Sequence, residues 1–320
     1  MKTNKNTCLL LTLLLAAGSL FAKVDRKQVD QFIQATAAEK NLDPKWVRDI
    51  ISQAKHQQSI IDAMSKPAEK TLKWFEYRKI FITEKRSQEG LEFWQKHQAV
   101  LDQVSAETGV PSEVIVAIIG VETFYGRIMG SHKVLDALYT LAFDYPKRSK
   151  FFTSELKHFL ALAQESHINP LTAKGSYAGA MGFGQFMPSS YRAYAVDFEA
   201  DNKIDLLNNP QDAIASVANY LKAHKWQTGG EILTAIEKPS ATMKFNQLKP
   251  HLTDHTSQKE YTVLELDMEN GDQAYWQGFQ NFYVISRYNH SHMYVSAVFQ
   301  LSQAVKKLKQ QPPTQTEASP

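Results

Sequence analysis

Apolar positions recur at helical spacing through most of the chain. Val29, Phe32 and Ile33 repeat at this spacing near the N-terminus,. The dipeptide Asp43-Pro44 is a helix-start signal placed directly before another apolar-periodic segment,. Glycine is nearly absent from residues 24–106, which suits long helices because glycine weakens a helix interior. The first third of the chain is therefore predicted to be helical.

One predicted helix is apolar around nearly its whole circumference. It follows the break Gly109-Val110-Pro111 and runs from about Ser112 to Tyr125. A helix that is apolar on all sides is normally buried. Further helices are predicted at about residues 135–143, 150–165, 212–224 and 294–308,.

After Gly229-Gly230 the pattern changes from helix to strand. Residues 261–266 alternate as a half-buried strand does, and Phe282–Ile285 is a second strand candidate,. A small sheet is therefore predicted over about residues 240–286. Residues 310–320 are rich in proline and polar side chains and are predicted to be a disordered tail,.

The first 22 residues have the pattern of a secretory signal. Lys2 and Lys5 precede an apolar run at residues 9–15, and Ala22 closes an imperfect cleavage site,. An uncleaved anchor or a buried helix is the alternative, but the run is short for a membrane span. Cys8 lies before most of the run rather than after it, so no lipid anchor is expected. The mature chain would then contain no cysteine and no disulfide.

Composition and charge narrow the class of protein. Hydrophobic residues make up 43% and charged residues 22% of the 320 residues, which is an ordinary globular balance. The net charge of +3 falls to about +1 once Lys2 and Lys5 are removed with the signal. This near balance argues against a general nucleic-acid-binding protein.

Glu122 is the strongest candidate for a catalytic residue. Ile115, Ile118 and Ile119 share its face of the buried helix,. Ionising a carboxyl beside an apolar wall is costly, so its pKa is expected to rise, as a general acid requires. The alternative from the residues alone is a solvated glutamate at a frayed helix end.

Several motifs in order extend this picture. Gly120–Gly126 places Glu122 at the helix end, and Gly179–Ser190 is a glycine-rich segment that closes on Gln-Phe-Met-Pro-Ser-Ser. Tyr191, Ala195–Asp197, Ser216–Tyr220 and Ser286–Ser291 complete the set. Together these motifs resemble the lytic murein transglycosylase B family of the lysozyme-like superfamily. The resemblance spans most of residues 30–305.

The resemblance implies a mainly α-helical (α+β) fold: a lysozyme-like core, a helical N-terminal domain and a small antiparallel β insertion. The expected organisation is a signal peptide (1–22), a helical domain (23–108), a catalytic core (109–238), a β subdomain (239–286), a C-terminal segment (287–309) returning to the core and helical domain, and the tail (310–320).

The resemblance also implies a reaction. Members of this family cleave the β-1,4 bond between N-acetylmuramic acid and N-acetylglucosamine, and the muramic acid 6-hydroxyl attacks its own anomeric carbon to form a 1,6-anhydro end. Glu122 would first donate a proton to the leaving oxygen and then accept the proton of the 6-hydroxyl. The substrate N-acetyl group can stabilise the positive charge, so the second carboxylate of most glycosidases is not required. No cofactor is expected for catalysis.

The family motifs place further residues at the substrate. These are Ser176, Gln185, Tyr288, Asn289, Tyr294, Tyr77 and the basic pair Lys147 and Arg148, which could meet peptide or lactyl carboxylates. Each has an alternative interpretation. The tyrosines could be core aromatics, Ser176 a turn residue, Gln185 a cap on a backbone group, and the basic pair a solvated surface feature.

Residues 197–205 resemble the first part of an EF-hand calcium loop. The donors would be the side chains of Asp197, Glu199, Asp201, Asp205 and Asp212 and the carbonyl of Lys203,. Asn202 replaces the usual glycine, Asn208 stands where a bidentate glutamate normally falls, and Asp212 closes the loop one residue late. The resemblance implies a structural Ca²⁺ of modest affinity; a solvated acidic loop is the alternative.

Three other functions stay open at this point. A lysozyme-type hydrolase would use the same glutamate, a non-catalytic glycan-binding protein would keep the cleft, and a structural periplasmic helical protein would leave the glycine-rich motif without a role. The expected location is the periplasm of a Gram-negative bacterium. The expected partners are peptidoglycan glycan strands and other cell-wall enzymes, with no nucleic acid, no stable membrane anchor and a monomeric state.

Overall fold

The computed structural model describes residues 26–65, 71–239, 243–254, 256 and 258–311. The predicted signal peptide and nearly all of the predicted tail lie outside the described residues. The helices up to the predicted buried one are α1 (Arg26–Lys40), α2 (Pro44–Ile51), α3 (Gln58–Met64), α5 (Trp74–Phe81), α6 (Glu84–Lys96), α7 (Gln98–Thr108) and α8 (Ser112–Thr123). The elements that follow are β1 (His132–Lys133), α9 (Val134–Asp144), the 3-10 turn η1 (Pro146–Arg148), α10 (Ser149–Glu165), β2 (Lys174–Gly175), α11 (Pro188–Tyr194), α12 (Pro210–Ala223), β3 (Leu233–Ile236), β4 (Leu252–Thr253), β5 (Glu260–Asp267), β6 (Gln273–Gly278), α13 (Gln280–Ser286) and α14 (His292–Gln310).

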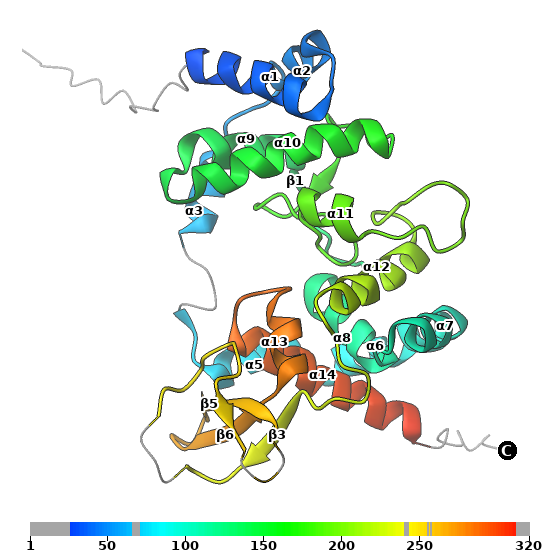
Figure 1. The fold of residues 1–320 in the computed structure, drawn as a ribbon, viewed down its shortest axis with the longest axis vertical. Helices are drawn as coiled ribbons and strands as arrows, with labels where there is room; N and C mark the ends of the chain where they lie inside the picture. The colour runs from blue at the N-terminus through cyan, green and yellow to red at the C-terminus, as the bar shows by residue number, and fades with distance from the viewer. Residues whose placement is uncertain (1–25, 66–70, 240–242, 255, 257, 312–320) are drawn as a thin grey trace, which may run out of the picture.

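The helices form two groups, one above the other in Figure 1. In the upper group α1 packs on α2 and α10, and α3 packs on α9. In the lower group α14 packs on α5, α6 and α8, while α12 packs on α7 and α8. The segment predicted as one helical domain, residues 23–108, thus contributes helices to both groups. The domain boundaries stay a prediction.

The N-terminal helices are joined to the core by specific hydrogen bonds. Asp43 caps α2 by accepting from the Lys45 amide at 2.9 Å, as the helix-start signal predicts,. Further along, Asp136 of α9 accepts from the Lys55 amide at 2.9 Å. Asp136 is buried, and a buried carboxyl needs such a partner. This bond fixes the connection after α2 against α9.

Helix α8 is buried on nearly every side, as its all-round apolar pattern predicts. It ends at Thr123, two residues before the predicted end, because Phe124 (φ 51°) and Tyr125 (φ 60°) both adopt the left-handed conformation. Each such residue costs about 1–2 kcal/mol relative to a right-handed one. The surrounding contacts must therefore hold this turn in place.

The small sheet is antiparallel with strand order β3-β6-β5-β4. The predicted strand at 261–266 is confirmed as part of β5. The predicted strand Phe282–Ile285 is wrong, because these residues form most of the buried helix α13. A four-residue apolar run fits a buried strand or a buried helix equally well. The long strand that pairs with β5, on the side away from β4, is β6 (Gln273–Gly278), which is less apolar.

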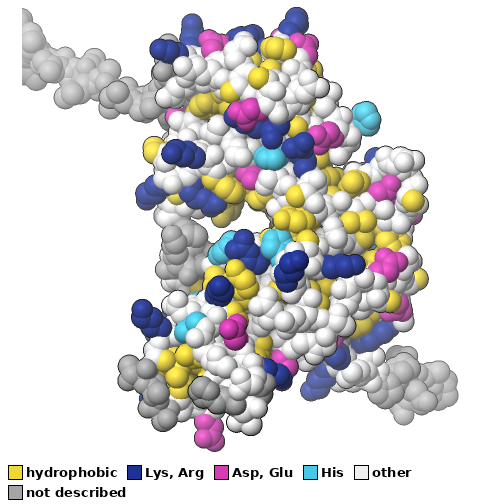
Figure 2. Space-filling view, in the orientation of Figure 1, with side chains coloured by type: hydrophobic (Ala, Val, Ile, Leu, Met, Phe, Trp, Pro, Cys, Tyr) yellow, Lys and Arg dark blue, Asp and Glu magenta, His cyan; other side chains and the backbone are white. Residues whose placement is uncertain are grey.

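The fold class is confirmed: the protein is mainly helical with small antiparallel sheets. Figure 2 shows a hollow near the centre of one face, between the upper and lower groups, with Lys, Arg and His side chains gathered below it. Among the described residues no single helix has the length and apolar composition of a membrane span. Within the same described residues, only α7 and α8 taken together reach that length and composition, and these two helices are bent by 114° relative to each other.

Candidate active site

Glu122 is held by a tyrosine from the C-terminal helix. The Tyr294 hydroxyl of α14 donates a hydrogen bond to Glu122 Oε1 at 2.7 Å. The Glu122 side chain stands in the last turn of α8, and the packing of α14 on α8 brings the two residues together across 172 positions of sequence. A hydrogen bond to an ionisable carboxyl orients it and is among the stronger side-chain contacts.

Tyr288 forms a second layer behind Tyr294. The two rings are parallel within 9° with centroids 6.5 Å apart, and the Tyr288 hydroxyl donates to the Gly184 carbonyl at 2.5 Å. Burial raises the pKa of both tyrosines well above 10, and the nearby Glu122 charge raises them further. Both hydroxyls therefore stay protonated and act as hydrogen-bond donors at any physiological pH.

Tyr77 reaches the same cluster from α5. Its side chain is buried, and its charge is close enough to Tyr294 to add to the rise in the Tyr294 pKa. Its ring packs at 5.0 Å from Phe81 and at 6.4 Å from Trp74. Three predicted site tyrosines, from three separate segments of the chain, thus gather around Glu122. Tyr77 and Tyr294 are buried, as core aromatics are, and the contact of the three tyrosines with a substrate stays a prediction.

Thr123 anchors the end of α8 to the glycine-rich segment. Its hydroxyl donates to the Phe183 carbonyl at 2.8 Å and accepts from the Gly126 amide at 3.0 Å. The residue next to Glu122 is therefore fixed to both the following turn and the facing loop. Sequence reasoning did not single out Thr123, although it stands inside the Gly120–Gly126 motif.

The glycine-rich segment is a tight turn in which Met181 and Phe186 pair across a β-bridge. Gln185, at φ 49°, turns its side-chain amide toward two backbone carbonyls, Met129 at 3.1 Å and Gly182 at 3.0 Å. Both carbonyl residues line a cavity of about 570 Å³, which Glu122 does not line. In this structure Gln185 does what its alternative interpretation describes: it caps backbone groups.

Ser176 also follows its alternative interpretation, as a turn residue. Its hydroxyl accepts from the Ala180 amide at 3.1 Å, and its own amide donates to the Ala180 carbonyl at 2.8 Å. These bonds shape the entry to the glycine-rich turn. Asn289, directly after Tyr288, accepts at its carbonyl from the Ser291 amide at 2.7 Å. The structure places both residues in backbone turns and leaves their predicted contact with a sugar untested.

A buried carboxyl holds the other end of the glycine-rich segment. Glu155 of α10 accepts from the Ser189 amide at 2.9 Å and from the Ser189 hydroxyl at 2.7 Å. Burial raises the Glu155 pKa, and the two bonds to Ser189 oppose that rise. Sequence reasoning missed Glu155, because nothing local distinguishes it from a surface glutamate in an amphipathic helix.

Arg148 lies between the two helix groups. Its guanidinium stacks on Phe151 at 4.3 Å. It is also close enough to His290, in the loop before α14, to contribute to a lowered His290 pKa, after burial and Arg287. The neighbouring Lys147 is exposed. The predicted basic pair thus presents one cation to the loop that carries Tyr288 and Asn289.

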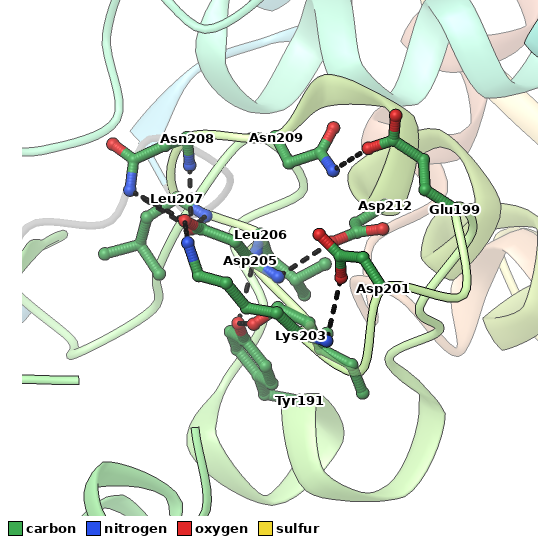
Figure 3. A network of polar contacts seen from close by, with 11 residues as sticks. Tyr191, Glu199, Asp201, Lys203, Asp205, Leu206, Leu207, Asn208, Asn209 and Asp212 are labelled. Atoms are coloured by element: carbon green, nitrogen blue, oxygen red, sulfur yellow. Dashed lines mark hydrogen bonds and ion pairs between the residues drawn. The ribbon is translucent and has the colours of Figure 1, made fainter. Parts of the chain in front are cut away.

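The acidic loop after α11 satisfies its own carboxylates (Figure 3). Asp197 accepts from the amides of residues 201 and 202, and Asp201 from the Lys203 amide at 2.8 Å. Asp212, at the start of α12, accepts from the Phe198 and Asp205 amides at 2.9 and 2.8 Å. These bonds hold the loop in a compact turn against the start of α12.

Two of the predicted calcium donors, Glu199 and Asp205, have other side-chain partners. Glu199 is turned toward the amides of Asn209 and Gln211, each at 2.8 Å. The Lys203 ammonium lies 3.2 Å from Asp205. Within the described ranges, no three His, Cys, Asp or Glu side chains are grouped as a metal site. In this conformation Glu199 and Asp205 are therefore held by partners other than a shared ion.

Comparison with known proteins agrees with this arrangement. The family model for the transglycosylase SLT domain matches residues 25–303. The membrane-bound lytic murein transglycosylase B of Escherichia coli (strain K12) is 42% identical over 296 residues, which cover 86% of this chain and 81% of that protein.

Solved structures show the same fold. The crystal structure of the soluble lytic transglycosylase SltB1 from Pseudomonas aeruginosa is 42% identical with a TM-score of 0.83, covering 88% of this chain and 99% of that chain. The Escherichia coli lytic transglycosylase Slt35, solved in complex with calcium, is 41% identical with a TM-score of 0.80, covering 88% and 93%. The chain therefore belongs to the lytic murein transglycosylase B family and is a lytic transglycosylase that acts on peptidoglycan.

Proposed function

We propose that the protein cleaves the β-1,4 bond between N-acetylmuramic acid and N-acetylglucosamine, leaves a 1,6-anhydro end, and uses Glu122 as acid and then base. The observation that carries this proposal is the 2.7 Å hydrogen bond from Tyr294 to Glu122 Oε1, inside a cluster of buried tyrosines. This contact holds the Glu122 carboxyl in one orientation at the end of α8.

The proposal assigns two proton transfers to this one carboxyl. Protonated Glu122 donates to the leaving glycosidic oxygen, and the resulting carboxylate then accepts the proton of the muramic acid 6-hydroxyl as that oxygen bonds to the anomeric carbon. Tyr294 donates to Glu122 throughout, because its pKa lies well above 10. Its hydrogen bond strengthens when the carboxylate forms, which favours the first transfer.

A relative's ligand is consistent with this product. SltB3 of Pseudomonas aeruginosa was solved in complex with NAG-anhNAM-pentapeptide, a fragment with an anhydro sugar. We extend that chemistry to this chain. We also propose that Ser176, Gln185, Asn289 and Arg148 contact the saccharide once Gln185 has left its backbone partners, and that the protein works in the periplasm after its signal is removed.

The test is mass spectrometry of muropeptides released from purified sacculi by the mature protein and by Glu122→Gln. Anhydro-ended fragments from the wild type, with release lowered at least about 100-fold in the variant, are expected, since a positioned acid–base residue contributes about 10²–10⁴. The glutamine keeps the shape of the side chain, so melting temperatures of the two proteins provide the folding control.

Two other results would each contradict part of the proposal. Reducing-end fragments would assign the protein to the hydrolases with the same acid, because hydrolysis adds a water that the anhydro product lacks. Equal release of muropeptides by the wild type and by Glu122→Gln would show that Glu122 is not the catalytic acid. Binding to sacculi without release by either protein would favour the glycan-binding alternative.

We also propose a structural Ca²⁺ in the loop closed by Asp212. The support is the complex of Slt35 with calcium, together with the amide hydrogen bonds that already arrange Asp197 and Asp201 around the loop. Binding would require Glu199 to turn inward and the Lys203 ammonium to leave Asp205. That rearrangement accounts for the modest affinity we expect.

A further inference from the structure

Arg86 connects a distant helix to the end of the catalytic helix. It lies on α6, 34 positions before Gly120, and its Nη1 donates to the Gly120 carbonyl at 2.6 Å. Gly120 stands in the last turn of α8, two residues before Glu122. The same carbonyl accepts from the Phe124 amide at 3.1 Å. The guanidinium is therefore a second donor to the carbonyl that closes the last turn, where helical hydrogen bonds run out.

The guanidinium is also held between two aromatic rings. It lies 4.5 Å from the Phe124 ring centroid and 5.2 Å from that of Phe81. Phe81 is the last residue of α5 and packs on Tyr77, which belongs to the tyrosine cluster around Glu122. Arg86 thus fills the space between the helix that carries Tyr77 and the turn that follows Glu122.

The turn after α8 holds Arg86 in return. The Tyr125 hydroxyl donates to the Arg86 carbonyl at 2.9 Å. The Tyr125 hydroxyl fits here because residues 90 and 120 are glycines. A Cβ atom on Gly90 would lie 2.4 Å from the hydroxyl oxygen, and a Cβ atom on Gly120 would lie 2.6 Å from it, and both distances are too short for a real contact. The left-handed conformation of Phe124 and Tyr125 makes this return contact possible.

Building on the proposed function, we propose that Arg86 is a positioning residue for Glu122. Its bond to Gly120 and its stacking on Phe124 bracket Glu122 on either side in the sequence. A shift of the last turn would move the Glu122 carboxyl away from the Tyr294 hydroxyl. In addition, a cation at a helix C-terminus offsets the negative end of the helix dipole, which otherwise disfavours ionisation of Glu122.

The chain offers a matched control in Arg127. Its guanidinium approaches the same Phe124 ring, at 5.4 Å, but it is exposed and pairs with Glu89 at 2.7 Å. Replacing Arg127 removes a cation from the same neighbourhood and leaves the bond to the α8 carbonyl in place. Arg127→Gln should therefore behave as the wild type.

The experiment compares Arg86→Met, Arg86→Lys and Arg127→Gln in steady-state kinetics on soluble, uncrosslinked glycan strands, with melting temperatures alongside. For Arg86→Met we expect kcat to fall about 10- to 100-fold with KM within about twofold, because small misplacements of a reacting group cost rate rather than binding. The lysine variant should retain an intermediate kcat, since it keeps the charge but loses the planar stack and fork.

The pH dependence separates positioning from a merely structural role. Tyr294 and Tyr288 both interact electrostatically with Glu122, and burial raises their pKa values well above 10, so neither titrates near neutral pH. Glu89, on the same helix as Arg86, and Tyr125 are the groups that act on the guanidinium. The alkaline limb of the kcat/KM profile should move to higher pH in Arg86→Met and stay in place in Arg86→Lys and Arg127→Gln.

The inference would be overturned if a folded Arg86→Met protein kept the kcat and the pH profile of the wild type. It would also be overturned if Arg127→Gln lost as much kcat as Arg86→Met. Should Arg86→Met not fold, Arg86→Lys and Tyr125→Phe carry the test, and unchanged kcat in both would overturn it. If the wild type itself cleaves no glycan, the proposed function fails and Arg86 has no reaction to support. Active wild type with unaffected variants contradicts the Arg86 inference alone.

Discussion

The end of α8 and the acidic loop after α11 are both turns rich in polar contacts, yet they are built differently. The turn at Glu122 is fixed by side chains from other elements, Tyr294 from α14 and Arg86 from α6. Its own Thr123 bonds to the glycine-rich segment. The loop at 197–209 is held mainly by its own residues and by the start of the next helix.

The difference separates two kinds of site. A catalytic carboxyl must be fixed in one place before the substrate arrives, because preorganised groups need no rearrangement during the reaction. A loop whose carboxylates bond to its own amides can exchange those partners for an ion at modest cost. We therefore expect the first region to respond to single substitutions and the second to solution conditions.

After the loss of Glu122 itself, the largest effect expected in these two regions comes from Tyr294→Phe, which removes the bond to Glu122 and keeps the ring. A hydrogen bond to a charged group contributes about 1.5–3 kcal/mol, so kcat/KM on glycan strands should fall about 10- to 100-fold. Tyr283→Phe, a tyrosine on the neighbouring α13, is the control and should stay within about twofold. Full activity of the Tyr294 variant would show that this contact does not position the acid.

A smaller effect is expected from calcium at the acidic loop. With Ca²⁺ at about ten times its dissociation constant, binding adds about 1.4 kcal/mol to the free energy of unfolding, or roughly 2–4 °C in melting temperature for a chain near this size. Asp197→Asn should reduce the shift. The calcium proposal is wrong if neither Ca²⁺ nor its removal by a chelator changes the melting temperature of the wild type.

The smallest effect concerns the pH dependence contributed by Glu155. Burial raises its pKa in the folded state above the ordinary 4.5, so folding favours the protonated form. Its contribution to stability is therefore greatest at acidic pH and declines as pH rises from about 4.5 through the folded value. Glu155→Gln should flatten this part of the stability curve in urea unfolding at several pH values. An unchanged slope would contradict the assignment to Glu155.

The secondary structure was predictable wherever one pattern was long enough. The all-round apolar run at 112–123 gave α8, and the alternation at 261–266 gave β5. The run Phe282–Ile285 failed because four apolar residues do not distinguish a buried strand from a buried helix. The strand β6, which pairs with β5, was missed because it carries polar residues among its apolar ones.

The residues of the candidate site also fall into two groups, those that motifs identify and those that only tertiary contacts reveal. Glu122 and the tyrosines around it were named from ordered motifs, and the fold brings Tyr77, Tyr288 and Tyr294 into one cluster. Arg86 and Glu155 stayed hidden, because each looks like an ordinary charged residue of an amphipathic helix until its partner, 34 positions away in both cases, is known.

The sequence by itself identified Glu122 and the nearby tyrosines as candidates, located most of the helices and the strand β5, and indicated that α8 is buried. These properties depend on local pattern and on motifs that lie close together along the chain. Only the tertiary structure decided where α8 ends, which way Gln185 and Glu199 point, and which cation meets the Gly120 carbonyl. Those outcomes depend on contacts between segments far apart in sequence, and local propensity does not encode them.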